Sequence, residues 1–235
     1  MMNFNLDKCE AITITNKRKP IIAEYKIHGQ ILKRVKNTKY LGVTIDHKLS
    51  WNTHIDNITK KANSTRAFLQ RNTKSCPVNI KAKCYTTYVR PTLEYASTVW
   101  DPHTAKSRAK LEAVQRRSAR YVFSDFDRYH SVTAMLTRLK WDSLQACRQH
   151  AKSVMMYRIV NSLVAIPHDQ YLMRSQSSTR GHNWRFLVPH TRVLAYKHSF
   201  FPSAIRIWNG LHQEVITKPT LDCFKIAMSS CNPGV

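Results

Sequence analysis

"KYLGVTIDHKLSWNTHI", residues Lys39 to Ile55, decides the fold, because a strand pattern changes to a helix pattern within it. Its first half, "KYLGVTID", is rich in β-branched and aromatic residues and is typical of a buried strand. From Ser50, a residue type that often caps helices, the period becomes helical. Residues at spacings of three and four then predict one buried helix face: Trp51, Ile55, Ile58, Ala62, Thr65 and Leu69. The stretch therefore predicts a fold with both strands and helices.

The residues before this stretch predict further short strands. "CEAITIT" alternates between the apolar Ile12 and Ile14 and small or polar neighbours, and "AEYKIHGQILKRV" predicts a hairpin that turns at His28 and Gly29. So few strands do not make a stable domain by themselves. The N-terminal strands are therefore expected to form only a small unit.

Most of the chain after Ser50 predicts helices. "VNIKAKCYTTYV" begins a helix that Arg90 and Pro91 should interrupt before "TLEYASTVW". Three more helices are expected in "TAKSRAKLEAVQRRSARYVF", "SVTAMLTRL" and "SLQACRQHAKSVMMYRIVNSLV", with Pro167 closing the block. Beyond it, "QSSTRGHNW" indicates a loop, "RFLVPHTRVLAY" one or two extended segments, and "SFFPSAIRIWNGL" a short final helix. The expected fold class is α+β and mostly helical, with a strand unit at 1–48, a helical domain at 49–166 and a mixed C-terminal region at 167–235.

Charge is the strongest compositional signal. The 38 Lys and Arg residues against 14 Asp and Glu give a formal net charge of +24. Such an excess repels itself unless a polyanion neutralises it, so nucleic acid is the first partner to consider. A membrane surface is the second, but the basic residues are scattered along the chain, and no apolar run approaches the length of a spanning helix. The N-terminus has charges where a signal peptide would be apolar, so we expect an intracellular protein with reduced cysteines.

The sequence predicts no catalytic residues, no cofactor and no small-molecule substrate. Enzymes that process nucleic acid commonly hold two metal ions with paired carboxylates, and this chain contains no Asp-Asp pair. Asp125 and Asp127, in "SDFDRYH", are better explained as a cap and a salt-bridge partner. A zinc site built from Cys223, Cys231 and histidines is conceivable, but no usual ligand spacing occurs, so no metal site is predicted.

Two helix faces carry the candidate binding residues. Helical spacing places Asn57, Lys60, Ser64 and Arg71 on one polar face, and Lys106, Arg116, Arg117 and Arg120 on another. Such spacing lets a helix contact successive phosphates along a strand. Each face taken alone is also explained as an ordinary solvated surface, whereas two such faces at this net charge favour binding. Five aromatic residues could stack on bases, although core packing explains most of them: Tyr40, Trp51, Trp100, Trp141 and Trp208.

Several ordered segments resemble reverse transcriptases of non-LTR (LINE-type) retrotransposons, especially the jockey-like lineages. The segments are "NFNLDKCEAITIT", "KYLGVTIDHKLSWNTHIDNITKKA", "YTTYVRPTLEYASTVWDPHT", "LEAVQRRSARYV" and "SFFPSAIRIWNGL", so the resemblance covers nearly the whole chain. It implies that the chain corresponds to the last palm motifs, the thumb and the C-terminal region of such a polymerase. A match of several motifs in order is specific, although any one motif alone would be weak.

The resemblance implies roles for particular residues. Asn5, Lys8 and Cys9 match the fourth palm motif, whose lysine lies near the incoming nucleotide. Tyr40, Leu41 and Gly42 match the primer grip, a tight turn whose backbone approaches the primer's 3′ end, where a residue without Cβ is suited. The helix from Ser50 would be the first thumb helix, with its polar face toward an RNA–DNA duplex. Lysines and arginines suit that lining, because A-form duplexes are recognised through backbone and shape.

The resemblance also implies what the chain lacks. The family's catalytic aspartates would lie before Met1, so this chain is not expected to polymerise alone, and magnesium is expected only in a full-length parent enzyme. Our leading hypothesis is a non-catalytic fragment that binds RNA, RNA–DNA hybrid or DNA duplex without sequence preference. The alternatives are an inactive transposon relic and a domesticated helical module that binds a protein. Neither the role of 167–235 nor the oligomeric state follows from the sequence.

Overall fold

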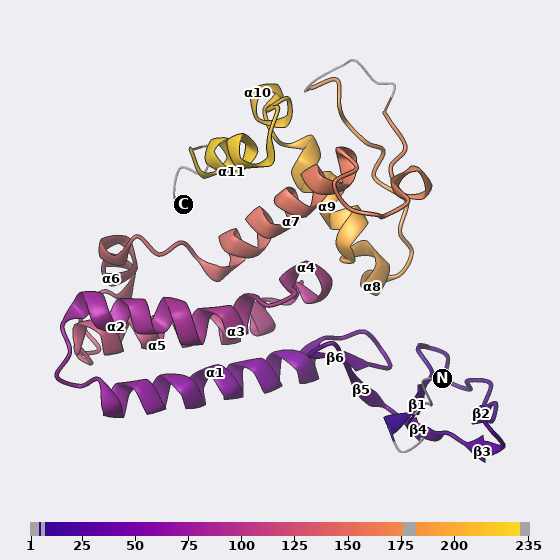
Figure 1. Cartoon of the computed structure of the whole chain (residues 1–235), viewed down its shortest axis with the longest axis horizontal. Helices are drawn as coiled ribbons and strands as arrows, with labels where there is room; N and C mark the ends of the chain where they lie inside the picture. The colour runs from indigo at the N-terminus through magenta and orange to yellow at the C-terminus, as the bar shows by residue number, and fades with distance from the viewer. Residues whose placement is uncertain (1–4, 6–7, 176–181, 231–235) are drawn as a thin grey trace. The chain divides into compact units, whose positions relative to one another are not determined.

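The structure is a computed structural model that describes residues 5, 8–175 and 182–230 (Figure 1). It is mostly helical with a few short strands, which confirms the α+β class. The chain forms two compact units, Met1–Asn57 and Ile58–Val235. The predicted division into regions 1–48, 49–166 and 167–235 stays a prediction. No helix among the described residues is both long enough and apolar enough to cross a membrane.

Within its described residues, the N-terminal unit contains three two-stranded sheets. β1 (Glu10–Ile12) pairs in parallel with β4 (Lys33–Val35), and β2 (Lys26–Ile27) pairs antiparallel with β3 (Gln30–Ile31). His28 and Gly29, at φ 50° and 79°, make the tight turn between β2 and β3. The hairpin predicted at these two residues is therefore confirmed.

The opening stretch contains a hairpin and not one strand. β5 (Asn37–Tyr40) and β6 (Val43–Asp46) pair antiparallel, and Tyr40 lies opposite Val43. Leu41 and Gly42, at φ 46° and 85°, form the two-residue turn. The expectation of one buried strand was wrong, because both turn residues adopt positive φ and reverse the chain, which leaves Val43 as the buried member.

Helix α1 (Asn52–Asn72) begins later than predicted. Trp51, at φ 59°, is the last residue before the helix, and its carbonyl accepts the first helical hydrogen bond, from the Ile55 amide at 2.9 Å. The prediction that Ser50 caps the helix was therefore wrong. The predicted apolar face is confirmed at its centre, because Ile55, Ala62 and Leu69 are all buried.

A second helical run continues through the predicted break. Figure 1 shows α2 (Val78–Cys84), the π-helical segment η2 (Tyr85–Val89) and α3 (Arg90–Glu94) as one line. The Arg90 amide donates to the Tyr85 carbonyl, the wider spacing of a π turn. Arg90 and Pro91 therefore do not interrupt the helix, because this turn accommodates the residue that has no amide hydrogen. The run ends before Ala96, at φ 52°, which precedes the short α4 (Ser97–Trp100).

Three capped helices form the centre of the second unit: α5 (Ala105–Phe123), α6 (Val132–Leu139) and α7 (Leu144–Val160). Their N-cap side chains are Thr104, Ser131 and Ser143, and each accepts a hydrogen bond from a backbone amide of the first turn. The helical spacing of Leu111, Val114, Ser118 and Val122 predicts one buried side of α5, and all four are inaccessible. The helix-forming pattern of this region is confirmed.

The C-terminal region contains more helices than expected. The 3-10 turn η3 (His168–Gln170) is followed by α8 (Leu194–Lys197), α9 (Phe200–Asn209), α10 (Gln213–Ile216) and α11 (Leu221–Ser230). The helix predicted in "SFFPSAIRIWNGL" is α9, but it is not the last one. Part of the loop predicted in "QSSTRGHNW" lies outside the described residues, and the extended segment predicted up to Tyr196 ends in α8.

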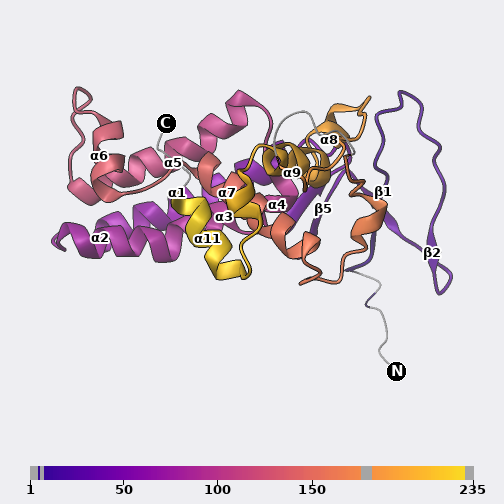
Figure 2. The same ribbon diagram turned by 90° about the horizontal axis from the view of Figure 1, so that it is seen from above.

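One apolar core holds this region together. α9 and α11 both lie against α7 (Figures 1 and 2). The core includes Trp208 and Phe224, with Tyr157 stacked on Phe224 at a centroid distance of 4.5 Å. Trp100 and Trp208 are fully buried, so core packing is confirmed for these two tryptophans.

Candidate nucleic-acid interface

The predicted polar face of α1 is open to solvent. Lys60, Ser64 and Arg71 are all exposed, and the opposite side of the helix is buried around Ala62. The helix contains no acidic residue after Asp56. Asp56 lies one turn before Lys60, and beyond it no carboxylate of the same helix interrupts the positive potential along this face.

The predicted basic face of α5 is exposed at three of its four residues. Lys106, Arg116 and Arg117 are exposed. Arg120 differs, because its guanidinium donates to the backbone carbonyls of Asp127 and, at 3.3 Å, of His130. Arg120 is therefore engaged in holding the loop that follows α5, a role that its helical position could not indicate.

The two faces adjoin within the second unit. Arg117 Nη1 donates to Asn63 Oδ1 of α1 at 3.3 Å. Arg66 lies close by, and its pKa is lowered, first because the side chain is partly buried and then because the charge of Arg117 is near. Like charges so arranged favour an anion between them. We refer to six residues as the α1–α5 basic surface: Lys60, Ser64, Arg71, Lys106, Arg116 and Arg117.

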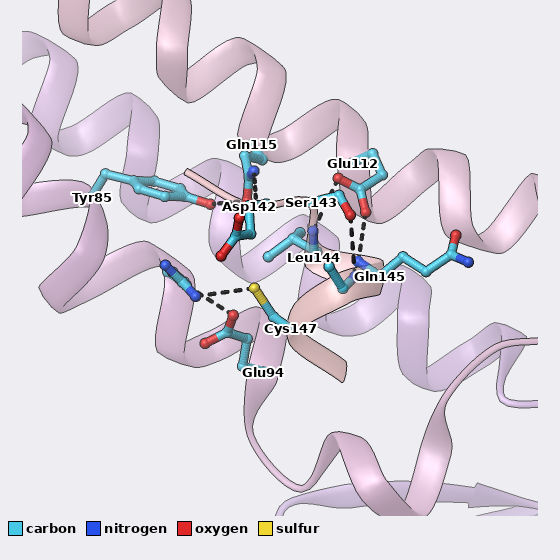
Figure 3. A network of polar contacts seen from close by, with 11 residues as sticks. Tyr85, Glu94, Glu112, Gln115, Asp142, Ser143, Leu144, Gln145 and Cys147 are labelled. Carbon is cyan, nitrogen blue, oxygen red and sulfur yellow. Dashed lines mark hydrogen bonds and ion pairs between the residues drawn. The ribbon is translucent and has the colours of Figure 1, made fainter. Parts of the chain in front are cut away.

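The carboxylate of Glu112 in α5 is directed at α7 and accepts backbone amides there (Figure 3). Glu112 is the one acid in α5, and its carboxylate accepts the backbone amides of Leu144 at 3.3 Å and Gln145 at 2.9 Å. This contact anchors the N-terminus of α7, where the helix dipole favours a negative charge. Beside it, Gln115 accepts from the Tyr85 hydroxyl at 3.0 Å and donates to the Asp142 carbonyl at 2.8 Å. Glu112 therefore faces α7 and does not oppose the basic surface.

The other side of this network borders a hollow of about 400 Å³, whose lining includes Arg90, Glu94, Cys147 and His150. Arg90 donates to Glu94 Oε1 at 2.8 Å and to Cys147 Sγ at 3.1 Å. Burial raises the pKa of the Cys147 thiol to about 11, so the thiol stays protonated and is a poor nucleophile. Burial also lowers the pKa of His150. These groups fit a structural role better than a catalytic one.

The turn that matches a primer grip lies at the tip of the β5–β6 hairpin. The side chains of Tyr40 and Leu41 are 65% and 73% exposed. Leu41 and Gly42 both adopt positive φ in this turn, which Gly42 does without steric cost. Exposed apolar side chains at the tip of a tight turn suit contact with another molecule. Contact with a primer end stays a prediction.

Lys8 and Asn57, the remaining site residues of the N-terminal unit, are also exposed. Lys8 precedes β1, and its backbone amide donates to the Asn5 carbonyl at 3.1 Å. Asn57 donates through its side-chain amide to the Thr44 hydroxyl of β6 at 3.4 Å. The roles predicted for Lys8 and Asn57 stay predictions.

Sequence reasoning missed the aromatic residues of the loop after α5. Phe126 and Tyr129 are exposed, and the loop around them is held by side-chain hydrogen bonds. Of the cap and salt-bridge partner predicted for Asp125 and Asp127, the structure gives Asp125 Oδ2 at 2.7 Å from His130 Nδ1, whereas the cap of the next helix is Ser131 and not an aspartate. The alternation of aspartates and aromatics in "SDFDRYH" was the signal that could have revealed this loop.

His182 is a buried structural residue. Its Nδ1 accepts the Trp184 backbone amide at 3.1 Å, and its Nε2 lies 3.1 Å from the Trp208 carbonyl. Since Nδ1 accepts, Nε2 carries the hydrogen and donates. Burial lowers the pKa of His182. This neutral histidine therefore attaches the segment that begins at residue 182 to α9.

Metal ligands do not gather in the part of the chain that the structure describes. No group of three or more His, Cys, Asp or Glu residues occurs there with suitable proximity. Cys231, one of the residues weighed for zinc, lies outside the described residues.

Comparison with known proteins supports the resemblance in part. Over 128 residues the chain is 29% identical to the RNA-directed DNA polymerase from mobile element jockey of Drosophila melanogaster. The similarity covers 52% of this chain and 13% of that protein. The chain matches no family model and no solved structure. It is therefore distantly related in sequence to a reverse transcriptase of a non-LTR retrotransposon, over a small part of that polymerase.

Proposed function

We propose that the chain is part of a non-LTR retrotransposon reverse transcriptase and that its α1–α5 basic surface binds the sugar–phosphate backbone of a template–primer duplex. The observation that carries the proposal is the contact between the two faces: Arg117 of α5 donates a hydrogen bond to Asn63 of α1. This junction turns two separate basic helix faces into one surface. The similarity to the jockey polymerase supports nucleic acid as the partner.

Backbone recognition suits the residue types of the surface. Five of its six members are lysine or arginine, which contact phosphates without reading base sequence. A-form-like duplexes are recognised mainly through shape and backbone. The surface is therefore expected to bind RNA–DNA hybrid or RNA duplex without preference for a base sequence. In this proposal the turn at Tyr40, Leu41 and Gly42 approaches the primer end, and Lys8 lies near the nucleotide.

Binding without polymerisation is the expected behaviour of this chain alone. Metal-assisted phosphoryl transfer needs carboxylates that hold the ions, and no Asp-Asp pair occurs in the sequence. Asp125 and Asp127 are the two aspartates nearest to each other in the sequence, and the Asp125 carboxylate lies 2.7 Å from His130 Nδ1. Magnesium chemistry therefore belongs, in this proposal, to other parts of a full-length polymerase.

Charge reversal on the surface tests the proposal. In fluorescence anisotropy with a labelled blunt RNA–DNA hybrid, Lys60→Glu combined with Arg71→Glu should weaken binding by roughly ten- to a hundredfold, because two charged contacts are lost. The matched control is Arg192→Glu combined with Lys197→Glu, which makes the same change in net charge at exposed positions near α8. Equal affinities of the two double variants would contradict the proposal and leave binding to net charge alone.

A further inference from the structure

The loop from Ser124 to Ser131, between α5 and α6, presents two aromatic side chains to solvent. Tyr129 is 81% exposed and Phe126 is 57% exposed. Large aromatic side chains in a water-exposed loop cost solvation free energy, and they recur where a protein binds a partner. We refer to residues 124–131 as the aromatic loop.

The aromatic loop is held in one conformation by its own polar groups. The Asp127 amide donates to Asp125 Oδ1 at 3.1 Å, and the Tyr129 amide donates to Asp127 Oδ1 at 2.9 Å. Asp125 Oδ2 lies 2.7 Å from His130 Nδ1. Arg120 donates to two loop carbonyls from α5. The aromatic side chains are therefore presented by an ordered scaffold, which lowers the entropy cost of binding.

A hollow of about 470 Å³ lies against the loop. Its lining combines the apolar Phe123, Ala134 and Met135 with Tyr129 and Arg138, and also includes Asp125, His130 and Ser131. The Arg138 guanidinium lies 5.0 Å from the centroid of Phe123, and that of Arg128 lies 5.1 Å from the centroid of Tyr129. Phe123 of the hollow and Tyr129 of the loop therefore each have a cation beside the ring.

Aromatic rings paired with arginines are what an unpaired nucleotide requires. A base stacks on an aromatic face with little regard to its identity, and the adjacent cations contact its phosphates. The two aspartates of the loop would oppose a phosphate, and their hydrogen bonds, between Asp125 and His130 and from the Tyr129 amide to Asp127, hold them within the loop without removing their charge. Arg138 lines the hollow, Arg120 donates to the loop and Arg128 lies over Tyr129, so three guanidinium groups stand against two carboxylates and the local charge favours an anion.

We propose that the aromatic loop and the hollow beside it bind an unpaired nucleotide of a nucleic-acid strand, by stacking on Tyr129 and Phe126 with phosphate contacts to Arg128 and Arg138. The proposal deepens the proposed function, because α5 carries both the basic surface and, at its end, this loop. A duplex on the basic surface and a single-stranded extension at the loop would belong to one ligand.

The test compares two RNA–DNA hybrids bound to the full chain, one blunt and one with a short overhang whose first unpaired base is 2-aminopurine. The overhang should tighten binding and quench the fluorescence of 2-aminopurine, because the base stacks. Tyr129→Ala combined with Phe126→Ala should remove the quenching and weaken overhang binding by roughly five- to tenfold, at the low end of aromatic–base stacking because the rings are exposed. Tyr129→Trp with Phe126 unchanged keeps an aromatic ring at the site, so it should retain both the quenching and the tighter overhang binding.

Tyr88→Ala is the matched control, since Tyr88 lies on η2 and is 60% exposed. Blunt binding without any gain or quenching from the overhang would overturn this inference and leave the duplex proposal intact. Quenching that depends on Tyr129 without blunt binding would support the loop and contradict the duplex proposal. If quenching occurs but is unchanged in the double alanine variant, the loop is not the nucleotide site and its exposed rings serve another partner, such as a protein.

Discussion

Asp101→Asn should destabilise the second unit strongly, because Asp101 is the counterion of two buried cations. Its Oδ1 lies 2.8 Å from Arg148 Nε, and its Oδ2 lies 2.7 Å from Lys152 Nζ. The side chains of Arg148 and Lys152 are 0% and 4% exposed. Two cations around one carboxylate leave an excess positive charge inside the protein. Removing the carboxylate charge would leave both cations uncompensated.

The magnitude follows from the burial of the three groups. Breaking a buried ion pair from one side costs about 3–5 kcal/mol, and the 20% exposure of Asp101 places this case near the lower value. A loss of about 3 kcal/mol corresponds to a fall in Tm of about 6–12 °C for a unit of this size. Lys152 has a second partner, Ser203 Oγ at 2.9 Å, which softens but does not replace the loss of the carboxylate.

Urea and thermal unfolding followed by circular dichroism measure this effect. The control is Asp222→Asn, which removes the same charge from an exposed pair with Lys225 at 3.0 Å, and which should cost at most about 1 kcal/mol. Asp101→Asn combined with Lys152→Met should recover part of the loss, because one uncompensated cation is removed. If Asp101→Asn and Asp222→Asn have free energies of unfolding within about 1 kcal/mol of each other, the reasoning about buried charge is refuted.

Three further outcomes are expected. Burial lowers the pKa of His182 below its ordinary 6.5, so the unfolded chain binds the proton more readily than the folded chain. The free energy of unfolding should therefore be full above pH 6.5 and fall as pH drops through the folded pKa. His182→Gln should flatten that slope in acid unfolding curves. Glu112→Gln should cost about 1–2 kcal/mol in urea unfolding, since the anchor of α7 loses its charge, and a cost near zero would show that the contact is dispensable. Gly42→Val should cost about 1–3 kcal/mol in the β5–β6 hairpin because of the positive φ, read as faster hydrogen exchange of the Tyr40 and Val43 amides; unchanged exchange would contradict the turn.

Local periodicity predicted the parts of the fold that depend on neighbours along the chain. The spacing of Ala62 and Leu69 placed the buried side of α1 correctly, and the same arithmetic placed Leu111 and Val114 in the core beneath α5. Helix α11 was missed although Leu221, Phe224 and Met228 carry a helical period, and Thr220 accepts the Cys223 amide as a cap would.

The features that sequence could not reveal depend on contacts between distant residues or on special backbone angles. Asp101 meets Arg148 across 47 positions, and Asn63 meets Arg117 across 54. Trp51 takes the position before α1 at a positive φ, which nothing in its residue type favours. Arg120 belonged to the predicted basic face by spacing, yet its donors are directed to the aromatic loop.

The salt dependence of binding to a blunt RNA–DNA hybrid tests the central claim most directly. If all five cations of the α1–α5 basic surface contact phosphates, the plot of log affinity against log salt concentration should have a slope near about −4.5. The variant that combines Lys60→Glu with Arg71→Glu should flatten that slope by about 2, since two contacts are lost. A slope that this variant leaves unchanged, despite the net charge of +24, would contradict a duplex site on α1 and α5.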